Sequence, residues 1–143
     1  MVRFLRFEGL RACRKMEPAR SSILLVDDDP DVRESLSLAL EMHGYLIVPA
    51  ENGQEALDKL KHTERLPLVV VLDLAMPILD GRGFLQQRAQ DRVLTNIPVI
   101  IVSGSRPDET LSEVEAFLPK PVEITRLLES INRIEAGKEY KPA

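Results

Sequence analysis

Several side chains that could do chemistry stand just after short apolar runs of the sequence. Three successive acids follow the first run, a fourth acid follows the most apolar run, and a hydroxyl and an ammonium group follow two later runs. In chain order they are Asp27, Asp28, Asp29, Asp73, Ser103 and Lys120. Crowded carboxylates repel one another, and a hard divalent cation such as Mg²⁺, which prefers oxygen ligands, would offset that repulsion.

The residue types in this set suit the transfer of a phosphoryl group. Asp73 could act as a carboxylate nucleophile toward phosphorus and form an aspartyl-phosphate. Lys120 supplies a point positive charge for a phosphoryl oxygen, and the Ser103 hydroxyl could hydrogen-bond to such an oxygen. The cation and the lysine would neutralise charge that builds up on the transferring group. Each residue alone could instead have a purely structural role, and we interpret Asp29 as a helix cap.

The apolar runs that precede these residues have the length and composition of buried strands. Their Val, Leu and Ile residues do not alternate with polar ones, which is typical of strands buried on both faces of a parallel sheet. The predicted strands span residues 23–26, 45–48, 68–72, 98–102 and 117–118.

Helical patterns follow the first two strands. Pro30 suits the first position of a helix, with Asp29 as its cap, and apolar residues then recur at helical spacing until Gly44. Asn52-Gly53 opens the second helix, in which Ala56, Leu57 and Leu60 form one apolar face.

The later helices are predicted from similar signals. Gly81 and Gly83 mark a turn before a third helix that continues to about Gln90, and residues 107–115 leave room for only a short fourth helix. The last helix has a regular apolar stripe, and we expect Gly137 to cap it.

This alternation of strands and helices predicts an α/β fold with helices on both faces of a five-stranded parallel sheet. We expect one domain at residues 21–136, a basic extension at 1–20 and a polar tail at 137–143. In an open α/β sheet the site lies outside the carboxyl ends of the strands, so the reactive residues should converge there.

The composition excludes several classes of protein. The 143 residues are 44% hydrophobic and 29% charged, as in ordinary globular domains, and no apolar run approaches the ~20 residues of a membrane-spanning helix. The single cysteine, Cys13, rules out an internal disulfide and fits a reducing, cytoplasmic location. Two histidines and one cysteine leave little for a zinc site.

The net charge of −4 is unevenly distributed along the chain. Residues 1–20 carry six basic and two acidic side chains, so the rest of the chain has a net charge of −8 and is a poor candidate for binding nucleic acid. Arginines interrupt every apolar stretch of the extension, which argues against a signal peptide. We favour a mobile tail, or an upstream extension before a natural start at Met16; a basic amphipathic helix is the alternative.

Four motifs in order resemble those of response-regulator receiver domains, the phosphoacceptor modules of two-component signalling. The motifs are Leu25–Pro30, Leu72–Pro77 with Asp80–Gly81, Val102–Gly104 and Leu118–Pro121. The resemblance covers about residues 22–136. It implies a flavodoxin-like sheet with strand order 2-1-3-4-5.

The resemblance also implies a role for each site residue. By position, Asp73 resembles the phosphorylated aspartate. Asp28 resembles the acid that holds Mg²⁺ directly, and Asp27 resembles the acid that holds it through water. The carbonyl of Ala75 matches a backbone metal ligand.

Three further positions match residues that sense the phosphoryl group in the family. Ser103 and Lys120 match the hydroxyl and the lysine that bind that group, and Phe117 matches the aromatic residue that repacks when the hydroxyl moves. The Lys120–Pro121 peptide bond matches one that is usually cis.

The sequence departs from the family pattern in two places. The segment from Ser103 to Lys120 is shorter than usual by about one helical turn, so we expect a shortened fourth helix and a monomer or weak dimer. Ala75 has no polar side chain where many relatives have one that tunes phosphoryl loss, so we expect an altered dephosphorylation rate.

We expect a stand-alone phosphoacceptor, not an enzyme. A sensor histidine kinase or a phosphotransfer protein would phosphorylate Asp73, and the product would switch binding to a downstream protein. An aspartate-nucleophile phosphatase or phosphotransferase is one alternative, although Ala75 stands where such enzymes usually need an acid. A receiver-like binding module that is not phosphorylated is another, and flavin binding is disfavoured because aromatic residues are only 4%.

Overall fold

The sheet has five parallel strands in the order β2-β1-β3-β4-β5, which confirms the predicted α/β fold and strand order. The computed structural model describes residues 21–104 and 114–139. The strands are β1 (Ser22–Val26), β2 (Leu46–Ala50), β3 (Val69–Asp73), β4 (Val99–Ser103) and β5 (Ala116–Pro119). Every residue of β3 and β4 is buried, as their unalternated apolar runs predict.

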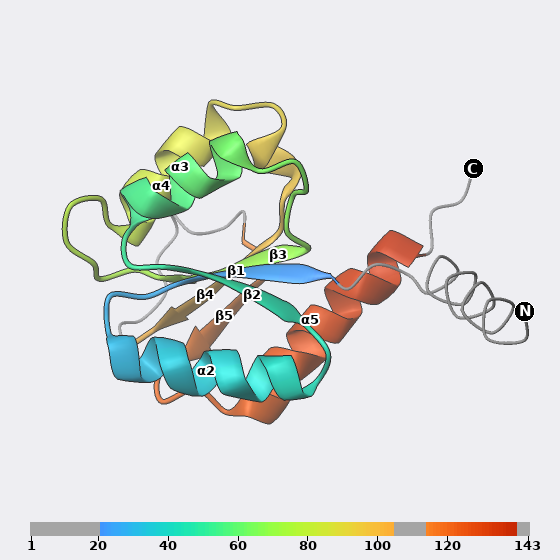
Figure 1. Ribbon diagram of the computed structural model, residues 1–143. Helices are drawn as coiled ribbons and strands as arrows, with labels where there is room; N and C mark the ends of the chain where they lie inside the picture. The colour runs from blue at the N-terminus through green and yellow to red at the C-terminus, as the bar shows by residue number, and fades with distance from the viewer. Residues whose placement is uncertain (1–20, 105–113, 140–143) are drawn as a thin grey trace, which may run out of the picture.

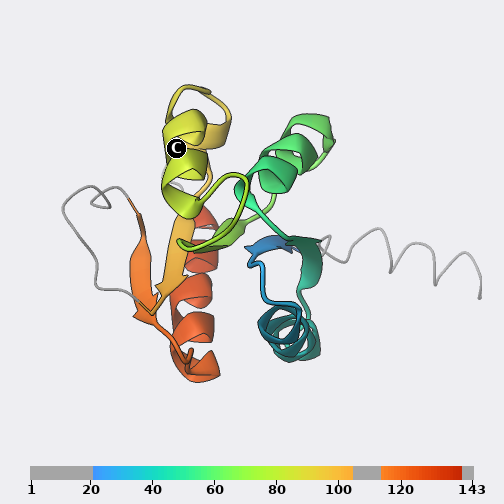
Figure 2. The same cartoon turned by 90° about the vertical axis from the view of Figure 1, so that its left-hand side faces the viewer.

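Helices cover both faces of the sheet (Figure 1; Figure 2). They are α2 (Pro30–Met42), α3 (Gly53–His62), α4 (Gly81–Ala89) and α5 (Ile124–Glu139), with a 3₁₀ turn, η1 (Leu94–Asn96), before β4. Helices α3 and α4 pack over one apolar cluster, which includes Phe84. Helices α2 and α5 pack over the other, which includes Leu40 and Leu127. The sheet is thus sandwiched between two cores, and its carboxyl edge is left for the loops.

Local capping explains where the first helices begin and end. The Asp29 side chain accepts hydrogen bonds from the Asp31 and Val32 amides, so the predicted cap is confirmed. The Asn52 side chain accepts one from the Glu55 amide, so the second helix begins where it was predicted to begin and Asn52 is its cap. Gly44 follows α2 with a φ of 91°, a left-handed conformation that glycine adopts without strain.

Several predicted boundaries were wrong. Strands β3 and β4 lie one residue later than predicted, because Asp73 and Ser103 still pair with the neighbouring strands, and β1 and β5 are longer than predicted. Strand β2 begins at Leu46 rather than at residue 45 and includes Pro49, which an edge strand tolerates because one side of its backbone has no partner strand. Helix α4 already includes Gly81, because Asp80 caps its first turn by accepting a hydrogen bond from the Gly83 amide. Helix α5 continues through Gly137 to Glu139, because Gly137 lacks the positive φ of a glycine cap.

Helix α4 carries a buried cation that braces the segment before β4. The Arg88 side chain donates to the Ile97 carbonyl from Nε (3.2 Å) and from Nη2 (2.7 Å), and to the Thr95 carbonyl from Nη2 (2.9 Å). Arg88 is only 7% exposed, so these carbonyls take the place of water around a charge held in the protein interior.

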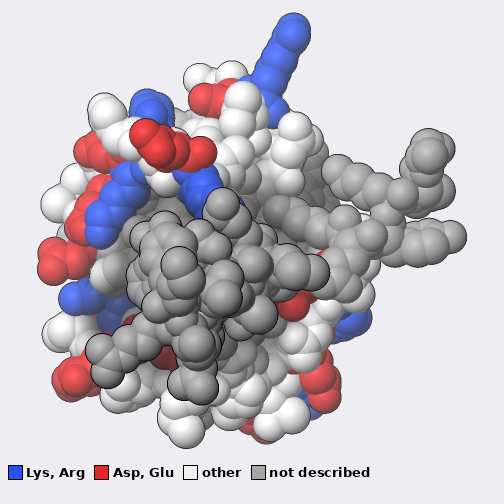
Figure 3. Space-filling view, turned by 45° about the vertical axis from the view of Figure 1, so that its right-hand side comes forward, with Lys and Arg blue, Asp and Glu red and all other residues white. Residues whose placement is uncertain are grey.

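Acidic and basic side chains are intermixed over the described surface that is visible in Figure 3. Among residues 21–104 and 114–139, no helix is long and apolar enough to span a membrane. The predicted short fourth helix, the basic extension with Cys13, and the end of the polar tail lie outside the described residues.

Candidate functional site

The carboxyl ends of four neighbouring strands bring the predicted site residues to one edge of the sheet. Asp27 directly follows β1, while Asp73 and Ser103 are the last residues of β3 and β4. Lys120 directly follows β5, and its amide donates a hydrogen bond to the Ser103 carbonyl (3.0 Å). Parallel pairing therefore places side chains together that are up to 93 residues apart in the sequence.

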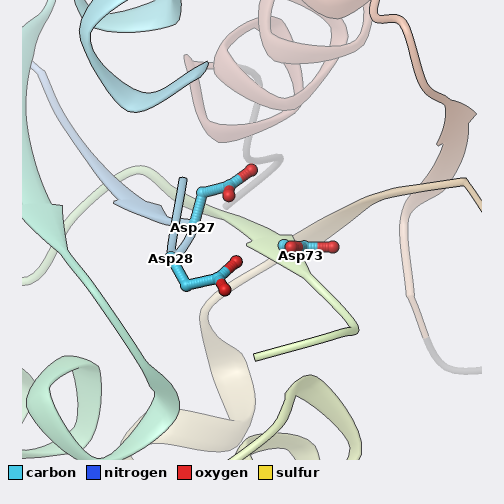
Figure 4. A group of neighbouring side chains, drawn as sticks. All are labelled: Asp27, Asp28 and Asp73. Carbon is cyan, nitrogen blue, oxygen red and sulfur yellow. The ribbon is translucent and has the colours of Figure 1, made fainter. Parts of the chain in front are cut away.

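Three carboxylates form the centre of this site. Asp27, Asp28 and Asp73 each offer an oxygen, and these oxygens lie within 4.8 Å of one another (Figure 4). Asp27 and Asp73 are only 2% and 6% exposed, whereas Asp28 is exposed to solvent. The cluster is therefore open on one side and held by the core on the other.

The Lys120 ammonium group lies beside the two buried carboxylates. Its Nζ is 2.8 Å from Oδ2 of Asp27 and 3.4 Å from Oδ2 of Asp73. Burial alone would lower the pKa of Lys120, but the hydrogen bond to Asp27 and the charges of both acids outweigh it, and the pKa is raised. Lys120 is therefore held as a cation at the site.

The environment of Asp73 disfavours its charged form. Burial, followed by the nearby charge of Asp27, raises the pKa of Asp73 against the lowering effects of Lys120 and of the Ala75 amide. That amide donates to Oδ1 of Asp73 (3.3 Å), so the backbone after β3 orients the carboxylate. A cation placed among the three acids would remove this penalty.

The other predicted residues lie around this centre. Asp29 caps α2 instead of joining the carboxylate cluster, and its amide donates to Oδ1 of Asp27 (2.9 Å). Ser103 is buried at the end of β4. Phe117 is half-buried in β5 and packs against the cluster under α3 and α4. The Lys120–Pro121 peptide bond is cis, which confirms the expectation for this bond.

Two residues that support the site are missing from the predicted set of site residues. Arg33, in the second turn of α2, donates from Nη1 to the Asp27 carbonyl (2.7 Å). Gly81 packs so closely on the end of β3 that a Cβ there would lie 2.6 Å from the Asp73 carbonyl oxygen. The available signals were an arginine soon after the acids and the Asp80-Gly81 pair, but neither pattern reveals a contact.

The donor set suits a hard divalent cation. Three carboxylates converge on one space, and two of them are too buried for water to screen their repulsion. Mg²⁺ usually takes one or two protein carboxylates and completes its coordination with other oxygen atoms, which this open cluster allows. The residues therefore fit the predicted metal.

Comparisons with known proteins agree with this fold. Residues 23–132 match the family model described as the response regulator receiver domain. The chain is 37% identical over 120 residues to Protein PilH of Pseudomonas aeruginosa, covering 80% of this chain and 98% of that protein. It is 36% identical over 124 residues to Response regulator Rre1 of Synechocystis, covering 82% of this chain but only 53% of Rre1.

A solved receiver domain has the same architecture. The receiver domain of the Francisella response regulator 1452 superposes with a TM-score of 0.75 at 27% identity, over 83% of this chain and 99% of that one. The chain therefore belongs to the response regulator receiver domain family of two-component signalling.

Proposed function

We propose that the protein is a phosphoacceptor whose Asp73 receives a phosphoryl group from a phosphohistidine of a sensor kinase or a phosphotransfer protein. The observation that carries this proposal is the position of Asp73. It is a buried carboxylate within 4.8 Å of two other acids and 3.4 Å from the Lys120 ammonium group. In this proposal the protein is itself the substrate, so it is not an enzyme that turns over a separate one.

The proposed transfer exchanges one bond to phosphorus for another. A carboxylate oxygen of Asp73 forms a bond to phosphorus while the P–N bond of the phosphohistidine breaks. The imidazole leaves with the electron pair of that bond, and it leaves as a neutral ring because its other nitrogen carries a proton. Lys120 would then pair with phosphoryl oxygens in place of Oδ2 of Asp73, and the Ser103 hydroxyl would hydrogen-bond to the same group.

We propose that Mg²⁺ is held by Asp28, by Asp73 and by the carbonyl of Ala75, with Asp27 acting through water. When bound, the metal would supply positive charge that offsets the three carboxylates and the transferring phosphoryl group. Asp27 keeps its direct contact with Lys120, 2.8 Å away. The protein thus provides a preorganised set of acids and one cation.

Phosphorylation would act on partners through two neighbouring strands. The new charge on Asp73 would draw the Ser103 side chain toward it, and Phe117, which is only half-buried in the adjacent β5, would repack. Both residues belong to strands that pair along the β4–β5 register. The rearranged surface would then bind a downstream protein.

The test is phosphorylation by a small phosphodonor. The full chain is incubated with acetyl phosphate and MgCl₂, and the intact mass is measured for the wild type, Asp73→Asn and Asp29→Asn. Asp29→Asn is the matched control, because asparagine caps a helix about as well as aspartate and Asp29 lies outside the proposed acceptor position. We expect one phosphoryl adduct on the wild type and on Asp29→Asn, and none on Asp73→Asn. No adduct on the wild type, or an undiminished adduct on Asp73→Asn, would refute the proposal.

A further inference from the structure

Arg33 connects two loops at the edge of the acidic cluster. Its side chain is only 17% exposed, although it extends from the surface helix α2. Nη1 donates to the carbonyl oxygen of Asp27 at 2.7 Å, and Nη2 lies 3.7 Å from Oε1 of Glu51, in the loop between β2 and α3. The guanidinium group therefore contacts both the acidic loop and the neighbouring loop.

The contact with the Asp27 carbonyl bears directly on Asp28. The carbonyl of Asp27 and the amide nitrogen of Asp28 belong to one planar peptide unit, so a bond to the carbonyl limits rotation of that plane. The amide of Asp27 is already held by the Ala50 carbonyl (3.1 Å), and its Oδ1 by the amide of Asp29 (2.9 Å). Arg33 thus completes a set of bonds that fixes the backbone leading into Asp28.

Asp28 depends on this backbone more than the other two acids do. Asp27 and Asp73 are buried and contact Lys120, whereas the Asp28 side chain is exposed. An exposed side chain samples several rotamers, so the direction in which its Cα–Cβ bond leaves the backbone decides how often its carboxylate meets Asp73.

We propose that Arg33 is a positioning residue for the metal site, which holds the Asp27–Asp28 peptide so that the Asp28 carboxylate faces Asp73. This inference rests on the proposed function, because it concerns the same Mg²⁺ site. It also predicts the direction in which the Mg²⁺ affinity changes when Arg33 is removed. A nearby guanidinium that acted only through its charge would repel Mg²⁺, and removing it would tighten binding; a positioning residue, once removed, weakens binding.

The test measures Mg²⁺ binding to the full chain by isothermal titration calorimetry without any phosphodonor. Loss of a partner that orients a metal ligand typically lowers affinity by about tenfold or more, so we expect the Kd of Arg33→Met to rise by about tenfold. Arg33→Lys keeps a charge and a donor and should recover part of the affinity. Arg126→Met is the matched control: Arg126 is an exposed residue on α5 whose Nε lies 3.6 Å from Glu123, and the Kd should stay close to that of the wild type.

A second measurement needs no metal. In metal-free protein, the amide of Asp29 should exchange its hydrogen faster in Arg33→Met than in the wild type, because the loop that holds its acceptor on Asp27 has lost a bond. The same amide should keep its wild-type exchange rate in Arg126→Met. If Arg33→Met does not fold, Arg33→Gln replaces it, since its amide is too short to make both contacts.

The outcomes separate this inference from the proposed function. Wild-type protein that binds no Mg²⁺, or Asp28→Asn that binds it as tightly as the wild type, would overturn the metal site and the role of Arg33 with it. If the wild type binds Mg²⁺ and Asp28→Asn weakens binding, the site stands. An unchanged or lower Kd in folded Arg33→Met would then overturn the positioning role alone.

Discussion

Replacing Gly81 with alanine should destabilise the protein, because the first residue of α4 packs against the backbone that ends β3. A Cβ at Gly81 would lie 2.6 Å from the carbonyl oxygen of Asp73 and 2.8 Å from Cα of Leu74. Both are backbone atoms of the segment that carries the candidate nucleophile, so neither can rotate away as a side chain could. The amide of Gly81 also donates to the Leu74 carbonyl (3.0 Å), and opening the contact would stretch that bond.

Two opposing effects set the magnitude. Forcing an extra methyl group into a packed site usually lowers the free energy of unfolding by about 1–3 kcal/mol. Alanine is favoured over glycine inside a helix by at most about 1 kcal/mol, and the gain is smaller at the first helical residue. We therefore expect Gly81→Ala to lose about 1–2 kcal/mol, and the displaced Asp73 backbone to weaken Mg²⁺ binding as well.

Gly137→Ala provides the matched control. Gly137 lies in α5, lacks a positive φ, and has no atom within 4 Å of its added Cβ, apart from its neighbours in the same helix. The same substitution should therefore leave the stability unchanged or raise it by up to about 1 kcal/mol. Urea unfolding followed by far-ultraviolet circular dichroism gives both values. A Gly81→Ala variant as stable as Gly137→Ala would refute the claim that the backbone at the end of β3 cannot shift to make room for the added methyl group.

Four further substitutions test other features. With EDTA present at pH 7, urea unfolding should show Asp73→Asn to be more stable than the wild type. The raised pKa of Asp73 means that its charged form opposes folding, and this penalty disappears as the pH falls below the pKa of an unfolded carboxyl group; a less stable variant at pH 7 would contradict this. Arg88→Met should lose about 3 kcal/mol, because two carbonyls lose a buried charged donor, while the exposed Arg92→Met should change little. Ile78→Gly should gain about 1 kcal/mol in thermal or urea unfolding, since Ile78 is 83% exposed and has a φ of 68°, which is strained for a β-branched residue; a loss would argue that the loop needs this side chain. Ala75→Asn should change the rate at which phosphorylated protein loses its phosphoryl group, and identical decay curves would show that this side chain has no such role.

The sequence alone determined the sheet and the edge at which the site lies. The apolar runs that became β3 and β4 are continuous and of strand length, which is typical of strands buried on both faces of a parallel sheet. Asp73 and Ser103 end those runs, and parallel strands bring their carboxyl ends to one edge. The caps at Asp29 and Asn52 were also predictable, because capping depends on residues only two or three positions away.

Boundaries that depend on backbone conformation were predicted less well. Glycine is a common helix terminator, but Gly137 keeps a helical conformation within α5, and among the residues that the structure describes the glycine with a positive φ is Gly44. Proline is a poor strand residue, yet Pro49 belongs to β2, because that strand lies at the edge of the sheet. In both cases the neighbouring structure decided between local options that the sequence left open.

Only the tertiary structure showed which side chains meet at the site. The contact of Lys120 with Asp27 joins residues that are 93 positions apart and depends on the register of four strands. Its 2.8 Å distance therefore cannot be predicted from any local sequence pattern. The bond from Arg33 to the Asp27 carbonyl and the close approach of Gly81 to β3 arise when a helix is packed against a strand end. A sequence states which residue types are available and in what order. The distances that set their charge interactions and pKa values follow from packing, because they depend on atoms that the chain brings together from afar.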